Sequence, residues 1–162
     1  LLFLVATIRR LLWVVTAFTL AHRITLALAV FGLVQLPSAP VEACIALSIV
    51  LLAREALATE ETLTRRYPWM VGFGFGLLHG LGFAGALSEV GLPSDQVPLA
   101  LLTFNVGVEL GQIAFVALVW WGLRWCAAHR PQTEMRIRTV SCYIMGSLAV
   151  WWTLERTLSI GG

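Results

Sequence analysis

Long apolar runs separated by short polar segments dominate the pattern along this chain. An α-helix needs about 20 apolar residues to cross the hydrocarbon core of a bilayer, whereas a strand of a membrane barrel needs roughly 10 residues of alternating polarity. The runs here have the helical length, so the pattern predicts one all-α domain over residues 1–162, a polytopic bundle of about five transmembrane helices. The predicted spans cover residues 11–34, 41–58, 69–90, 99–121 and 137–158.

The segments between the spans carry turn and loop residues. A cluster with two prolines ends the first span, polar loops follow the second and fourth, and a short turn follows the third. These segments are residues 35–40, 59–68, 126–136 and 91–98. Residues 1–8 are apolar but too short to span, so we expect them to be the end of a further, truncated N-terminal helix.

Composition places the chain in lipid. It is 59% hydrophobic and 12% charged, with a mean hydropathy of +0.85, whereas a soluble domain carries about 25% charged residues. A soluble fold of this size could not keep so much apolar surface from water. There is no basic tail with interleaved aromatic residues, so we expect no nucleic-acid partner, and nothing resembles a nucleotide-binding loop. The lipid bilayer is the predicted partner, and a homo-oligomer is left open.

The distribution of arginine predicts the orientation. All eleven basic residues are Arg, and cytoplasmic loops of membrane proteins carry an excess of positive charge. One side of the predicted bundle holds Arg9, Arg10, Arg54, Arg65, Arg66, Arg124, Arg130, Arg136 and Arg138. The opposite side holds only Arg156, and Arg23 lies within a span. We therefore expect a multi-pass protein whose Arg-rich loops face the cytoplasm.

Several polar side chains lie inside the predicted spans. His22 lies near the middle of the first span and His79 near the middle of the third, while Asn105, Glu109 and Gln112 share one face of the fourth. Ionisable residues are costly in a membrane and are retained where they have a partner or a function. These residues therefore predict a polar site near the bilayer midplane.

Further polar residues lie close to this set. Thr25 lies on the same stripe as His22, three residues further along the helix. Arg23 must be paired or reach the interface, and we predict that it lies within ion-pair distance of a carboxylate, with Glu109 as the natural partner. Glu42 begins the second span, where we expect it to interact with the helix dipole, with contact to the site as the alternative.

Glycines on two spans are expected to pack helices together. Small residues at four-residue spacing let transmembrane backbones approach closely. The third span carries Gly72, Gly76 and Gly80 beside His79, and the fourth carries Gly107 and Gly111.

The midplane residue types suit a transition metal. Imidazole, carboxylate and amide groups bind Ni²⁺, Co²⁺ or Zn²⁺ better than Ca²⁺ or Mg²⁺, and histidine can also carry protons. Two alternatives remain open. Mid-membrane histidines on different helices could ligate a b-type haem in a redox subunit, or the polar residues could merely lock helices together in an assembly factor or membrane anchor.

Four sequence runs resemble the HupE/UreJ membrane proteins. They are residues 16–26 (TAFTLAHRITL), 41–48 (VEACIALS), 75–84 (FGLLHGLGFA) and 104–112 (FNVGVELGQ). The resemblance covers four of the five predicted spans in order. It implies nickel or cobalt uptake of the kind that serves hydrogenase and urease maturation. Arg23 departs from the family pattern, which usually has a small polar residue after this histidine.

The resemblance and the residues together predict a bacterial inner-membrane permease, not an enzyme, that moves Ni²⁺ or Co²⁺ by alternating exposure of the midplane site. The expected metal ligands are His22, His79, Glu109 and Asn105, and the residues expected beside them or along the ion path are Gln112, Thr25, Glu42 and Arg23. Zn²⁺ is a third candidate ion.

Overall fold

The computed structural model describes residues 7–58, 62–89 and 97–160, and every regular element within them is a helix. This confirms the all-α prediction. The helices are α1 (Ile8–Val30), α2 (Ser38–Leu57), α3 (Leu63–Arg66), α4 (Pro68–Glu89), α5 (Val97–His129) and α6 (Pro131–Leu158). Most of residues 1–8, predicted to be the end of a further helix, and most of the predicted turn over residues 91–98 lie outside the described residues.

Within the described residues, two helices are long and apolar enough to cross a membrane by length and composition. They are α1, over Ile8–Val30, and the part of α5 over Pro98–His129. The remaining long helices are more polar or less fully described. α2 carries Glu42, Arg54 and Glu55 among its 20 residues. Two such helices support the assignment of this chain to the membrane less strongly than five would.

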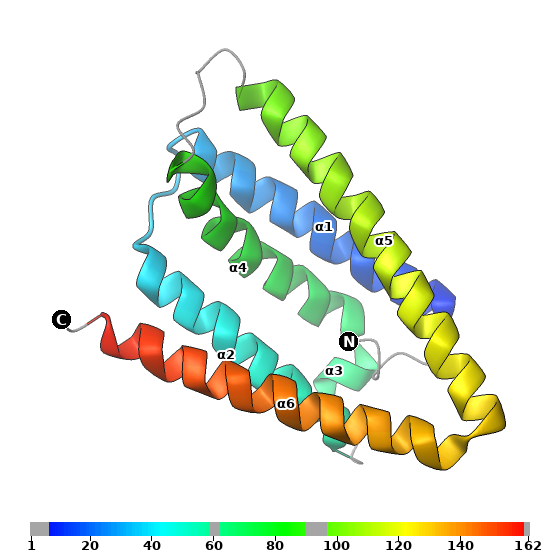
Figure 1. Ribbon diagram of the computed structural model, residues 1–162. Helices are drawn as coiled ribbons and strands as arrows, with labels where there is room; N and C mark the ends of the chain where they lie inside the picture. The colour runs from blue at the N-terminus through cyan, green and yellow to red at the C-terminus, as the bar shows by residue number, and fades with distance from the viewer. Residues whose placement is uncertain (1–6, 59–61, 90–96, 161–162) are drawn as a thin grey trace.

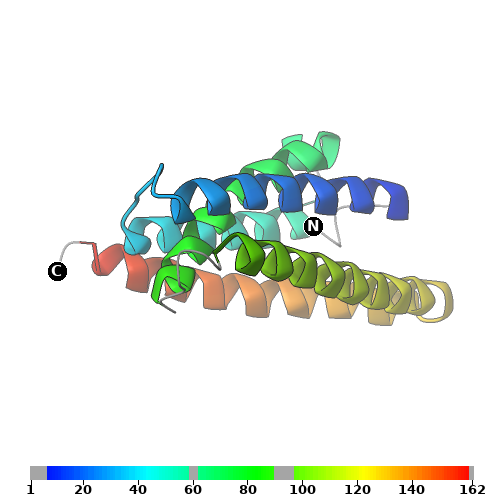
Figure 2. The ribbon, with the colours of Figure 1, turned by 90° about the horizontal axis from the view of Figure 1, so that it is seen from above.

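The five long helices lie side by side in the order α5, α1, α4, α2, α6 (Figure 1). The most extensive contacts join α1 to α4 and α2 to α6, whereas α5 touches α1 and α6 over smaller areas. Seen from above, α5 and α6 lie on the opposite side of the molecule from α1 (Figure 2). The structure is thus built from two closely packed helix pairs and a loosely attached α5.

Glycines bring α1 and α4 into backbone contact. A Cβ added at Gly72, Gly76 or Gly80 would lie closer than 3.0 Å to atoms of α1, including the backbone oxygens of Phe18 and His22. The three glycines are four residues apart and therefore lie along one face of α4. Their predicted role in packing agrees with this contact.

The glycines of α5 behave differently. A Cβ added at Gly107 or Gly111 would meet no described atom within 4 Å, so these glycines do not pack against another described helix. Periodicity predicted that they share a face of the helix, but it could not predict that this face is open.

Helix ends differ from the predicted span ends where backbone hydrogen bonds decide them. α1 ends at Val30 because Gly32 adopts a φ of +73°, and the amides of Gly32 and Leu33 bond to the carbonyls of Ala29 and Leu28. This is the usual glycine-based helix stop. The first helix therefore ends four residues before residue 34, where the apolar run ends.

Two predicted loops contain helix. Within residues 59–68, Thr62 caps the short helix α3 by accepting a hydrogen bond from the Arg65 amide. The predicted loop over residues 126–136 is wrong, because α5 continues to His129 and α6 begins at Pro131. Polarity marks where an apolar span ends, but a helix can continue into water, and proline is favourable at its first position.

We predict that Gly76→Ala lowers the free energy of unfolding by about 1–3 kcal/mol, because the new methyl group overlaps the Phe18 carbonyl and the backbones must separate. Denaturant unfolding of the purified protein in detergent measures this. Gly74→Ala is the matched control, since its Cβ would meet nothing within 4 Å. Equal destabilisation by both substitutions would contradict the proposed backbone contact.

Candidate functional site

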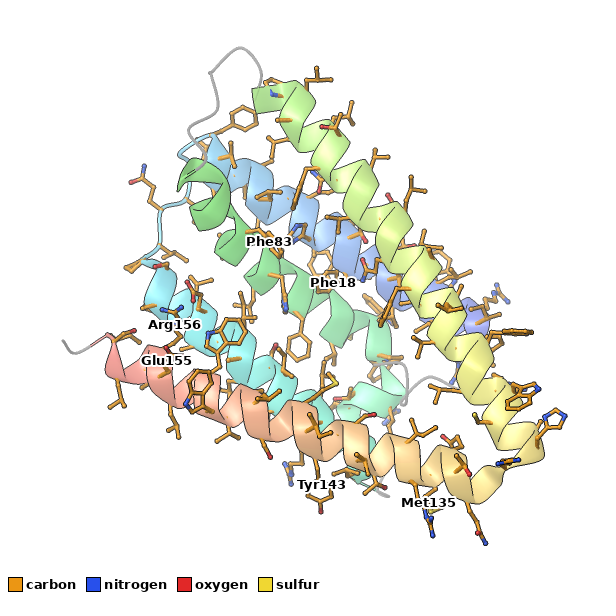
Figure 3. The ribbon with its side chains drawn as sticks, in the orientation of Figure 1. Phe18, Phe83, Met135, Tyr143, Glu155 and Arg156 are labelled. Carbon is orange, nitrogen blue, oxygen red and sulfur yellow. The ribbon has the colours of Figure 1, made fainter. Side chains whose placement is uncertain are left out.

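The contact between α1 and α4 brings His22 and His79 to the same part of the molecule. Phe18, one turn before His22, stacks on the His22 ring with centroids 6.1 Å apart and meets the His79 ring edge-on at 5.2 Å. Phe83, one turn after His79, contacts His22 edge-on at 5.5 Å. Figure 3 shows Phe18 and Phe83 between the two helices. The two histidines therefore share one aromatic cluster.

The ring nitrogens of these histidines are only partly used. His79 Nδ1 lies 2.7 Å from the Phe75 carbonyl, which can only accept a hydrogen bond, so Nδ1 carries the proton in this arrangement. A neutral ring then has its lone pair on Nε2. His22 is 3% exposed, and neither of its ring nitrogens has a hydrogen-bond partner among the described residues. Both imidazoles therefore retain lone pairs for a ligand.

Arg23 pairs with Glu109. The guanidinium Nη2 of Arg23 on α1 donates to the Glu109 carboxylate on α5, and the two side chains are 40% and 34% exposed. The predicted ion pair is thus confirmed. It joins α5 to α1 next to His22, and it occupies the carboxylate that the sequence predicts as a metal ligand.

Asn105 and Gln112 bring side-chain amide groups to α5, the helix that also carries Glu109. The hydroxyl of Thr19 on α1 can donate to Val15 O at 2.9 Å or to Gln112 Oε1 at 3.5 Å. Asn105 donates through Nδ2 to the Leu101 carbonyl at 2.7 Å, while its buried Oδ1 has no partner in the described part of the chain. Thr25 donates within α1, to Ala21 O at 3.2 Å or His22 O at 3.4 Å. Asn105 therefore retains an unused oxygen donor, while Thr25 is satisfied locally.

Glu42 has a partner that the sequence reasoning missed. Its carboxylate forms an ion pair with Arg156 on α6, with Oε2 of Glu42 2.7 Å from Nε of Arg156, and Figure 3 labels Arg156 on that helix. The signal was present, because Arg156 was the one arginine on its predicted side. The aromatic contacts of Phe18 and Phe83 were also missed, although each lies four residues from a histidine. A role for Glu42 along an ion path stays a prediction.

Among the described residues, no three His, Cys, Asp or Glu side chains lie together as a group that could hold a metal ion. The structure brings the two histidines into one cluster and Glu109 onto Arg23. The complete set of four ligands therefore remains a prediction, one that requires Glu109 to leave Arg23.

We predict that Glu109→Gln lowers stability because Arg23 then lacks its carboxylate partner, and that adding Arg23→Gln recovers part of the loss. The coupling free energy should be about 0.5–3 kcal/mol, as expected for contacting residues. A double-mutant cycle of unfolding in detergent measures it. Glu134→Gln, at a glutamate with no ion pair in the described ranges, is the control. Strict additivity of the two substitutions would rule out the pair as a stabilising contact.

Comparison with known proteins identifies the family. A family model described as HupE / UreJ protein matches residues 1–156. Searches of curated proteins and of solved structures found no significant match. The HupE/UreJ proteins are membrane proteins associated with nickel and cobalt transport, and they form a transporter and accessory family rather than an enzyme class. Because the match covers nearly the whole chain, this protein belongs to the HupE/UreJ family.

Proposed function

We propose that this protein is an inner-membrane permease for a divalent transition metal, Ni²⁺ or Co²⁺. The observation that carries the proposal is the position of His22 and His79 on either side of Phe18 at the α1–α4 contact. The described residues use neither nitrogen of His22 and only Nδ1 of His79. Imidazole is a good ligand for these ions. Family membership supports the same substrate class.

The proposed topology has five crossings, made by α1, α2, α4, α5 and α6. Support comes from the directions of the helices. The start of α1, the end of α2, the start of α4, and the junction of α5 with α6 lie at one end of the molecule (Figure 1). These are the segments that contain nine of the eleven arginines. By the positive-inside rule, this end faces the cytoplasm.

In the proposed site, His22 and His79 bind the ion first and Glu109 completes the coordination, with Asn105 Oδ1 as a further oxygen donor. The carboxylate cannot serve Arg23 and a metal equally well, because both compete for the same negative charge. Arrival of the ion therefore exchanges one partner of Glu109 for another. Exchange of this kind would link ion binding to the position of α5. A movement of α5 would in turn expose the site to one side of the membrane and then to the other. Nothing in the chain resembles a nucleotide-binding loop, so an ion gradient or passive flow supplies the driving force.

The geometry supports this proposal over a haem-binding subunit. A porphyrin between two axial histidines needs their helices well apart, whereas α1 and α4 are in backbone contact at Gly76 and Gly80. An absorption spectrum without a Soret band would exclude haem directly. The alternative function is a membrane anchor whose polar residues only hold the helices together. The transport assay below distinguishes this anchor from a permease.

We predict that His79→Ala and Glu109→Gln each lower Ni²⁺ uptake by about tenfold or more, since even residues that only support a metal ligand are worth 10–100-fold. Uptake is measured in liposomes that contain the purified protein and an internal metal-sensing dye. His129→Ala is the control, because this histidine lies at the end of α5 and bonds the Trp125 carbonyl. Unchanged uptake in both variants, with lowered thermal stability in His79→Ala, would support the anchor instead.

The topology has its own test. In a chain whose native Cys44, Cys126 and Cys142 are replaced by Ala, we expect Ser38→Cys to react with a membrane-impermeant thiol reagent added to spheroplasts. Thr133→Cys should react only after the membrane is opened. Both positions are exposed in the structure, so only the bilayer should separate their reactivities. Equal labelling of the two in intact spheroplasts would overturn the five-crossing arrangement.

A further inference from the structure

A groove lies beside the α1–α4 contact, at the end where both helices begin. Its volume is about 640 Å³. Arg10, Trp13 and Leu20 line it from α1, while Arg66 from α3 and Trp69 and Phe73 from α4 line the other side. No acidic side chain is among its lining residues. The groove is separate from the His22–His79 cluster, and the proposed transport mechanism does not use it.

The lining changes in character along the groove. The two sides of the groove present the same order, an arginine first, then a tryptophan, then an apolar side chain. One side has Arg10, Trp13 and Leu20 from α1, and the other has Arg66 from α3 followed by Trp69 and Phe73 from α4. At 1.5 Å per helical residue, the ten residues from Arg10 to Leu20 extend about 15 Å, which is half of a hydrocarbon core of about 30 Å. The groove thus matches one leaflet of a bilayer in length and in polarity.

The two arginines are placed to bind an anion. Both are exposed, and neither has an ion-pair partner within the described ranges. The Arg66 guanidinium lies over the Tyr67 ring, 5.4 Å from its centroid, which limits its freedom. Guanidinium groups bind phosphate oxygens through paired N–H donors. The tryptophans beside them are 63% and 52% exposed for Trp13 and Trp69, as expected of residues that meet lipid at the membrane interface.

We propose that this groove binds one anionic phospholipid of the cytoplasmic leaflet. The phosphate lies between Arg10 and Arg66, the glycerol region lies against Trp13 and Trp69, and an acyl chain follows Leu20 and Phe73. The inference rests on the proposed orientation of the protein in the membrane, but not on metal transport. Bound lipid would cover the side of the α1–α4 contact and so stabilise the helix pair that carries the two histidines.

The test is a titration of the purified full chain in detergent with dioleoyl phosphatidylglycerol or dioleoyl phosphatidylcholine, read by native mass spectrometry. We expect the anionic lipid to bind about thirtyfold more tightly, since each of the two arginines contributes about 1 kcal/mol toward anionic lipid near a membrane surface. Arg10→Gln combined with Arg66→Gln should remove this preference. Arg9→Gln should keep it, because Arg9 neighbours Arg10 but does not line the groove.

A second variant separates the groove from general surface charge. Ala17 lies in the wall, so Ala17→Trp should fill the apolar part of the groove while leaving both arginines in place. We expect this variant to bind phosphatidylglycerol about tenfold more weakly, a loss of about 1.4 kcal/mol. Glycerol 3-phosphate should not compete, because it lacks acyl chains. Equal binding of the two lipids, loss of preference in Arg9→Gln, full binding by Ala17→Trp, or competition by glycerol 3-phosphate would each overturn the proposal. Failure of metal uptake would leave it intact.

Discussion

The backbone contact between α1 and α4 is the interaction on which the candidate site depends. Gly72, Gly76 and Gly80 give α4 a face without side chains, and α1 fills it with its own backbone. His79 lies between two of these glycines, so the same contact that joins the helices sets the position of its ring relative to His22. In a membrane, where lipid is as apolar as a leucine side chain, close approach of this kind is a main source of helix association.

α5 is held to α1 by different means. The pair of Arg23 with Glu109 is a polar contact, and Gln112 Oε1 lies within 3.5 Å of the Thr19 hydroxyl. Apolar contacts of α5 with α1 include Trp120 and Phe104. Polar contacts can exchange partners, whereas close packing of backbones cannot do so without a cavity. The arrangement thus combines a fixed helix pair that carries the histidines with a more weakly attached helix that carries the carboxylate.

The sequence predicted those features that depend on one helix at a time or on the cost of charge in lipid. Helical periodicity placed the three α4 glycines beside His79, and the cost of an unpaired Arg23 predicted its bond to Glu109. Contacts between helices were harder to predict. Periodicity groups Gly107 with Gly111 but does not show what they face, and the pairing of Glu42 with Arg156 depends on α2 lying beside α6. Helix continuation through residues 126–129 depends on local hydrogen bonds that polarity does not reveal.

The polar atoms inside the helices fall into two classes, and the contrast between them bears on function. The carboxylates of Glu109 and Glu42 have arginine partners, as expected where an isolated charge is costly. The ring nitrogens of His22 and the Asn105 oxygen are buried without partners among the described residues. An unsatisfied buried polar group costs about 1–3 kcal/mol. A ligand that accepts the lone pair of one His22 nitrogen and that of Asn105 Oδ1 would recover part of that cost, and a divalent metal ion is such a ligand.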